Sequence, residues 1–306
     1  MFKGFFNRMY NGNPNRPDLD PGDMPKNRFE LFFTTLGVRF GDLIKLNLLL
    51  VVFMAPVLIW TALSFTALNN VDPNMPVADT TNQMLSVLLT YLIGNLILLP
   101  LAGPPLAGMT YVVRNYARDE HAWLWSDFKE HMKKNWKQSS VMMLLAALVS
   151  LVSVYTIMTY IEAMKSQDWM WVMMVLFIVF VGIFFLSFMY AFPMLVTYKL
   201  KLGQVIRNSL MLALGRLPFT IIFGFIALFP FVLALIIMAG FGLADGAVFS
   251  YTILGLVVYY VLIGFTLAAF ITNSYTNATF DKLMKSDDDP RRPPVDPEDM
   301  DREVKP

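Results

Sequence analysis

The chain has 306 residues, of which 56% are hydrophobic and 15% charged, with a mean hydropathy of +0.53. A soluble core of this length cannot bury that much apolar surface, so the composition excludes an ordinary soluble domain and predicts an integral membrane protein in a lipid bilayer. The net charge of +1 excludes a nucleic-acid footprint over the whole molecule, and the absence of cysteine excludes disulfides, thiolate metal sites and cysteine nucleophiles.

The N-terminal segment, residues 1–42, is expected to carry no cleavable signal, because its first long apolar run begins only near Leu43. Aromatic residues at helical spacing over 2–10 predict a short helix at the lipid headgroups. Residues 11–27 are rich in Asn, Pro, Asp and Gly and predict a linker. A second amphipathic stripe over 29–40 fits either a membrane-surface helix or an ordinary helix packed on the bundle.

Six apolar runs have the roughly 20 residues needed to cross about 30 Å of hydrocarbon. They lie near residues 43–68, 84–112, 139–160, 170–197, 217–239 and 248–272. Strands of this length would leave backbone groups unpaired in lipid, so each run is predicted to be a helix. Pro100, Pro104 and Pro105 predict that the second span kinks or ends early. The expected fold class is an all-α polytopic membrane helical bundle, with a six-helix domain over 43–272.

Basic residues predict how the bundle is oriented. Lys and Arg gather in the N-terminal segment, in the loops after the second and fourth spans and in the C-terminal tail, whereas the other three loops hold only Lys165. Cytosolic segments are enriched in Lys and Arg, so both termini are expected in the cytosol. The tail, residues 273–306, is expected to be largely disordered, because its acidic and proline-rich end from residue 286 has too little apolar surface to offset the entropy of ordering.

The two basic loops predict amphipathic helices on the cytosolic surface. In the first loop, the residues expected to contact headgroups or to dock a partner are Trp123, Trp125, Phe128, Lys129, Lys133, Trp136 and Lys137. Their spacing fits an interfacial helix and also a partner-docking helix. No nucleic acid is expected as a partner, because the flanking spans hold this loop against anionic lipid. The second loop, 198–217, predicts another membrane-surface helix.

Catalytic and metal-binding motifs are absent from the sequence. His121 and His131 lack the spacing of a shared metal site and are expected to be solvated loop residues. No nucleophile elbow, P-loop or dinucleotide-binding glycine pattern is present, so neither an enzyme nor a cofactor is expected. The second through sixth spans hold no charged residue in their interior. Asn47 and Asn95 are the candidate intramembrane polar residues, expected to bond another helix rather than a substrate.

Six segments carry motifs of a known family. They are Gly41–Leu43, Leu46–Leu49, Pro104–Arg114, Arg118–Glu120, Asp127–Gln138 and Tyr190–Pro193. Together they resemble the YesL-like family of uncharacterised bacterial membrane proteins. The resemblance implies a multi-pass protein of the bacterial plasma membrane. Because genes of this family tend to lie beside carbohydrate importers of the ATP-binding-cassette type, it also implies an accessory role in carbohydrate transport. It implies no catalytic or binding residues.

Two functions of different class therefore fit the sequence. One is a non-catalytic accessory or regulatory partner of a carbohydrate ATP-binding-cassette importer, contacting its subunits or other membrane proteins through the cytosolic helices. The alternative is an uncoupled transporter or channel-like facilitator for a small neutral or amphipathic solute, which six spans with proline kinks would also fit. The sequence leaves the oligomeric state open.

Overall fold

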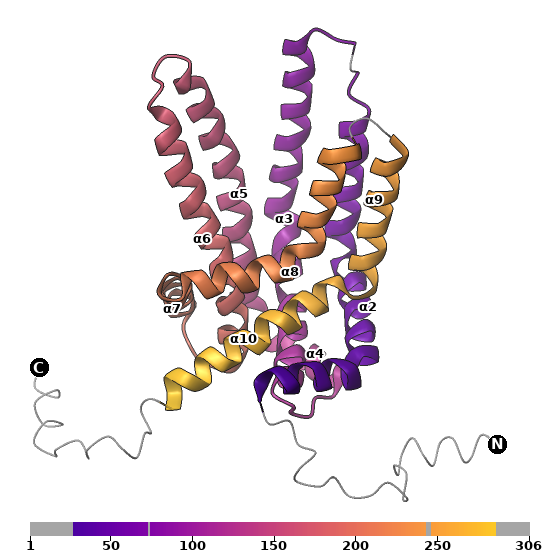
Figure 1. Ribbon diagram of the computed structural model, residues 1–306, viewed down its shortest axis with the longest axis vertical. Helices are drawn as coiled ribbons and strands as arrows, with labels where there is room; N and C mark the ends of the chain where they lie inside the picture. The colour runs from indigo at the N-terminus through magenta and orange to yellow at the C-terminus, as the bar shows by residue number, and fades with distance from the viewer. Residues whose placement is uncertain (1–26, 73, 243–245, 286–306) are drawn as a thin grey trace, which may run out of the picture.

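The computed structural model describes residues 27–72, 74–242 and 246–285 (Figure 1). The helix predicted over 2–10, nearly all of the predicted linker and the acidic tail from residue 286 lie outside the described residues. The helices are α2 (Arg28–Asn69), α3 (Val77–Ala117), α4 (Leu124–Lys134), α5 (Trp136–Met164), α6 (Met170–Thr197), α7 (Leu202–Gly215), α8 (Leu217–Ile237), η2 (Met238–Gly242), α9 (Gly246–Tyr259), η3 (Tyr260–Gly264) and α10 (Phe265–Lys285). The elements η2 and η3 are π-helical, and the described part of the chain contains no strand.

Six helical stretches are long and apolar enough to cross a membrane, so the predicted all-α membrane bundle is confirmed. Four are α2, α3, α5 and α6. The fifth is α8 with most of η2, and the sixth combines α9, η3 and α10. The turns that join α2 to α3 and α5 to α6 lie at one end of the bundle, which we call the distal end (Figure 1). The other end, called the basic end, holds α4, α7 and the start of α2.

Most of the packed interior lies toward the basic end. A first core cluster joins α2, α3, α4 and α10 and includes Leu46, Val112 and Phe270. A second cluster joins the last turns of α6 to α7 and α10 and includes Tyr190 and Val205. Toward the distal end the apolar side chains of α6 point outward, a surface that lipid can cover.

Two glycines of α3 let neighbouring backbones approach closely. A Cβ at Gly103 would overlap the carbonyl of Ser139 on α5, and a Cβ at Gly108 would lie 2.5 Å from the carbonyl oxygen of Phe128 on α4. Small residues allow such close helix packing in membranes, where apolar burial alone gives little driving force. The α3 helix is thereby the central element, in contact with α2, α4, α5, α6 and α10.

The predicted span boundaries differ from the structure at three places. The α3 helix does not end early but continues through Pro100, Pro104 and Pro105 to Ala117. Proline is tolerated in a membrane helix because neighbouring helices can bond the backbone groups that it leaves without partners. The predicted boundary between residues 42 and 43 falls inside α2. The α10 helix passes residue 272, so 273–285 belong to the bundle rather than to a disordered tail. The reason is that Asn273 and Thr276 are buried and bond their own helix backbone.

Candidate functional site

The α4 helix is fixed to the bundle by Phe128. This side chain is fully buried, with its ring centroid 5.6 Å from that of Phe53 on α2. At the start of α4, the Asp127 carboxylate accepts a 2.8 Å hydrogen bond from the backbone N–H of Trp123. Phe128 is therefore inaccessible to headgroups or a partner, contrary to the prediction. Helical spacing identifies an apolar stripe, but it does not say whether the stripe faces the protein core or the lipid.

The other six predicted contact residues are exposed at the basic end and form what we call the docking surface. They are Trp123, Trp125, Lys129, Lys133, Trp136 and Lys137. Trp123, Trp125 and Trp136 are 68%, 53% and 54% exposed. The ammonium nitrogens of Lys129 and Lys137 lie 5.9 Å and 5.6 Å from the ring centroids of Trp125 and Trp136. Such cation–π contacts hold the long side chains over the rings.

The segment 123–137 is not one continuous helix. The α4 helix ends at Lys134, Asn135 forms a turn, and α5 begins at Trp136. The Asn135 side chain donates to the carbonyl of His131 at 3.1 Å, so it does not cap α5. Trp136 and Lys137 consequently belong to the first turn of a spanning helix, which fixes their position relative to the bundle.

His131 is buried, contrary to the prediction that it is solvated. Its ring stacks on Tyr111 with centroids 3.3 Å apart, and its Nδ1 has no hydrogen-bond partner in the described part of the chain. Burial lowers the pKa of His131, and the nearby positive charge of Lys134 lowers it further. His121, in contrast, is exposed and lies edge-on to Trp123. One sequence pattern could have predicted that His131 is buried. It is the helical alternation of Phe128, His131 and Met132 with exposed lysines.

Asn47 and Asn95 differ in their surroundings. The Asn47 side chain is fully buried and donates to the carbonyls of Tyr260 and Val261 at 2.8 and 2.7 Å. Its oxygen accepts a 3.0 Å hydrogen bond from the backbone N–H of Thr266. Asn47 therefore bonds another helix and links α2 to the junction of η3 and α10. Asn95 is also buried, but its side-chain oxygen has no partner among the described residues.

The structure shows an ion-pair network at the basic end that the sequence did not predict. Asp281 on α10 pairs with Arg28 at 2.9 Å and with Arg118 at 3.4 Å, and Arg118 pairs with Glu120 at 2.7 Å. The side chain of Asn277 donates to the Arg114 carbonyl at 3.3 Å. These contacts join the start of α2, the end of α3 and the end of α10. Residues so far apart in sequence give no local pattern that would predict their pairing.

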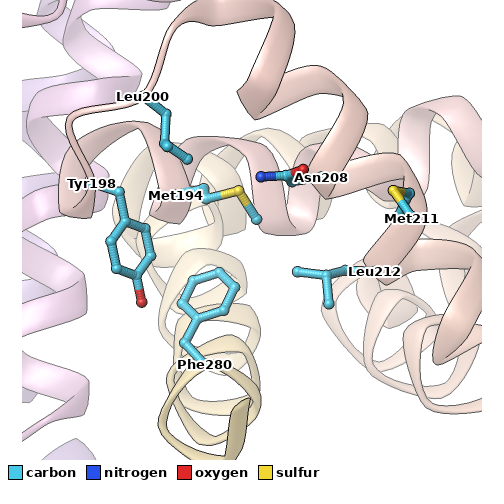
Figure 2. A pocket seen from close by; sticks show the side chains of 7 residues that line it. All are labelled: Met194, Tyr198, Leu200, Asn208, Met211, Leu212 and Phe280. Atoms are coloured by element: carbon cyan, nitrogen blue, oxygen red, sulfur yellow. The ribbon is translucent and has the colours of Figure 1, made fainter. Parts of the chain in front are cut away.

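The structure contains two neighbouring hollows that the sequence did not predict, and the first of them adjoins the docking surface. The lysine cleft, about 490 Å³, lies between residues 133–138 and residues 195–200. The apolar groove, about 310 Å³, is lined by Met194, Tyr198, Leu200, Asn208, Met211, Leu212 and Phe280 (Figure 2). Burial raises the pKa of the Tyr198 phenol, so this group stays neutral at physiological pH. Among the described residues, no group of three or more His, Asp or Glu is placed to hold a metal ion.

Comparison with known proteins finds a family that part of the chain is similar to. Residues 43–157 match the family described as protein of unknown function, DUF624, which includes the YesL-like bacterial membrane proteins. The resemblance predicted from the sequence is thereby confirmed. The motif from Arg114 to Gln138 lies inside the match, whereas Tyr190–Pro193 lies beyond it. No curated protein and no solved structure matches the chain.

Proposed function

Because the chain is similar over residues 43–157 to a family of bacterial membrane proteins, we propose that it is a non-catalytic accessory protein of the plasma membrane. Its docking surface contacts the membrane subunits of another complex. The family resemblance favours a carbohydrate ATP-binding-cassette importer as that complex. Both termini and the basic end lie in the cytosol, as the distribution of Lys and Arg supports.

The observation that carries this proposal is the exposure of three tryptophans on a rigidly anchored segment. Tryptophan is enriched where proteins bind one another, because a large ring contributes contact area at low entropic cost. Phe128 holds α4 against the core, so Trp123 and Trp125 keep a fixed position without a partner. A surface that is preorganised in this way loses little conformational entropy when a partner binds.

The alternative function, a facilitator for a small solute, has weaker support. A facilitator needs polar groups that a solute can contact inside the membrane. Asn47 on α2 and Thr266 on α10 instead use their hydrogen-bonding groups to join α2 to the junction of η3 and α10. Proline kinks and π-helical turns allow motion, but structural membrane helices contain them as well.

Co-purification from native membranes tests the proposal. The full-length protein, crosslinked in cells, is compared with a Trp123→Ala/Trp125→Ala/Lys129→Ala variant. Trp169→Ala/Trp171→Ala is the matched control, because these two tryptophans are similarly exposed at the distal end. We expect importer membrane subunits with the wild type and the control but not with the docking-surface variant. Equal recovery with all three proteins would refute the proposal.

A further inference from the structure

The lysine cleft has walls from two different parts of the chain. One wall is the junction of α4 and α5, and the other is the end of α6 with the extended residues that follow it. The side chain of Gln138 donates to the Leu200 carbonyl at 3.2 Å and so ties the two walls together. The cleft is consequently a fixed feature of the fold rather than a gap between independent loops.

The cleft carries positive charge without a compensating acid. Lys133, Lys134, Lys137 and Lys199 are among its lining residues, and no Asp or Glu is. None of these lysines forms an ion pair with a described Asp or Glu. The first turn of α5 also opens into the cleft, and no side chain caps it. The partial positive charge of a helix N-terminus adds to that of the lysines, so the cleft is suited to an anion.

The apolar groove continues from the cleft. Tyr198 and Leu200 line both hollows, so an occupant of one can extend into the other. Figure 2 shows Met194 in the middle of the groove lining, with Leu212 and Phe280 directed toward it. Six of the seven lining side chains are apolar or aromatic, which suits a hydrocarbon chain.

We propose that the lysine cleft and the apolar groove together bind one anionic glycerophospholipid. The phosphate lies among the four lysines, and one acyl chain lies along Met194, Met211 and Phe280. The cleft lies where α5 begins and α6 ends, at the depth that lipid headgroups occupy beside spanning helices. Basic pockets between membrane helices recognise anionic headgroups in this way. A free phosphate ion would use the cleft alone.

The inference can fail independently of the proposed docking function. Lys133, Trp136 and Lys137 belong to both the docking surface and the cleft. Lys134 and Lys199 line the cleft but are not part of the docking surface. A Lys134→Gln/Lys199→Gln variant therefore tests lipid binding, whereas the tryptophan variant described above tests docking.

Binding is measured on the full-length protein in a neutral detergent, by native mass spectrometry. The probes are phosphatidylglycerol, phosphatidylcholine and glycerol phosphate. We expect the wild type and a Lys45→Gln/Lys165→Gln control, which changes two exposed lysines outside the cleft and the docking surface, to prefer phosphatidylglycerol over phosphatidylcholine. We expect Lys134→Gln/Lys199→Gln to bind phosphatidylglycerol about tenfold more weakly or worse. Met211→Trp, which fills the groove at an exposed position, should also weaken binding of the lipid.

Three results would overturn the inference. One is equal phosphatidylglycerol binding by the wild type and Lys134→Gln/Lys199→Gln. Another is glycerol phosphate binding as tightly as the lipid, which would identify a soluble phosphate as the ligand. The third is loss of binding in Lys134→Arg/Lys199→Arg, since this variant keeps both charges and separates loss of charge from misfolding.

Discussion

The Asn47 side chain bonds α2 to a π-helical turn. Its amide donates to the backbone carbonyls of Tyr260 and Val261 in η3, and its oxygen accepts from the backbone N–H of Thr266. Inside a membrane no water can replace such a donor. The irregular η3 turn and the buried Asn47 therefore depend on each other, although 213 residues separate Asn47 from Tyr260.

We expect Asn47→Leu to destabilise the protein by roughly 1–3 kcal/mol, because it removes two hydrogen bonds to backbone carbonyls and takes the acceptor away from the buried Thr266 N–H. Thermal unfolding in detergent measures the loss. Asn95→Leu is the matched control, since the buried Asn95 oxygen has no partner within residues 27–72, 74–242 and 246–285, and its removal should be neutral or stabilising. Equal destabilisation by both substitutions would contradict the role assigned to Asn47.

His131 should make the stability of the folded protein depend on pH. Its pKa in the folded state lies below the ordinary value of about 6.5, because burial and the charge of Lys134 disfavour the imidazolium. Glu130, Asp127 and Arg114 also act on it, more weakly than burial does. The unfolded chain thus binds the proton more readily, so stability is full above about pH 6.5 and falls as the pH drops through that value.

The expected result is a lower unfolding temperature at about pH 5.5 than at about pH 8 for the wild type, and a smaller difference for His131→Phe. The phenyl ring can stack on Tyr111 but cannot be protonated. His121→Phe serves as the control because His121 is exposed, and it should retain the wild-type dependence. If the unfolding temperature of His131→Phe depends on pH as strongly as that of the wild type, other groups must cause the dependence.

The α4 helix lies against α3 because Gly108 has no side chain. We expect Gly108→Ala to push the Phe128 backbone away and to expose α4 to limited proteolysis, because the new Cβ would lie 2.5 Å from the Phe128 carbonyl oxygen. Gly182→Ala in α6 meets no atom within 4 Å and should stabilise its helix by about 0.5–1 kcal/mol. Unchanged protease resistance in Gly108→Ala would show that the two helices adjust without separating.

At the level of elements, hydropathy predicted all six spans, because crossing lipid requires about 20 consecutive apolar residues in a helix. It did not predict where the helices end. The stretch Asn273–Asn277 looks like the water-exposed end of a span, yet its polar groups bond backbone carbonyls and the stretch lies buried against α3. The apolar stripe containing Phe128 was likewise identified, but which surface it faces depends on packing between distant segments.

At the scale of the whole molecule, charge and packing coincide at one end. The basic end holds the Arg28, Asp281 and Arg118 network, the docking surface and the lysine cleft. The lysines that line the cleft come from both basic loops, so the sequence could indicate their membrane side but not their proximity. Only the fold brings Lys199 to the same hollow as Lys134. This concentration of Lys and Arg at one end predicts which side of the membrane that end faces.

The positive-inside pattern predicts that the basic end faces the cytosol, and a chain without native cysteine allows a direct test. Cysteines at Asn74 and Ala244 should react with a membrane-impermeant thiol reagent in intact cells. Cysteines at Glu130, Asn135 and Ser286 should react only after the membrane is permeabilised. Ala244 and Ser286 lie outside the described residues, so the exposed pair Asn74 and Glu130 is the primary comparison.

Because Asn74 lies in the turn between α2 and α3 and Glu130 lies on α4, one reagent reports both ends of the bundle. Labelling after permeabilisation is the control, since it shows that each cysteine is accessible. Labelling of Glu130→Cys but not Asn74→Cys in intact cells would reverse the orientation. The docking surface and the lysine cleft would then face away from the cytosol, so they could not reach the cytosolic side of an importer's membrane subunits or the anionic lipid of the inner leaflet.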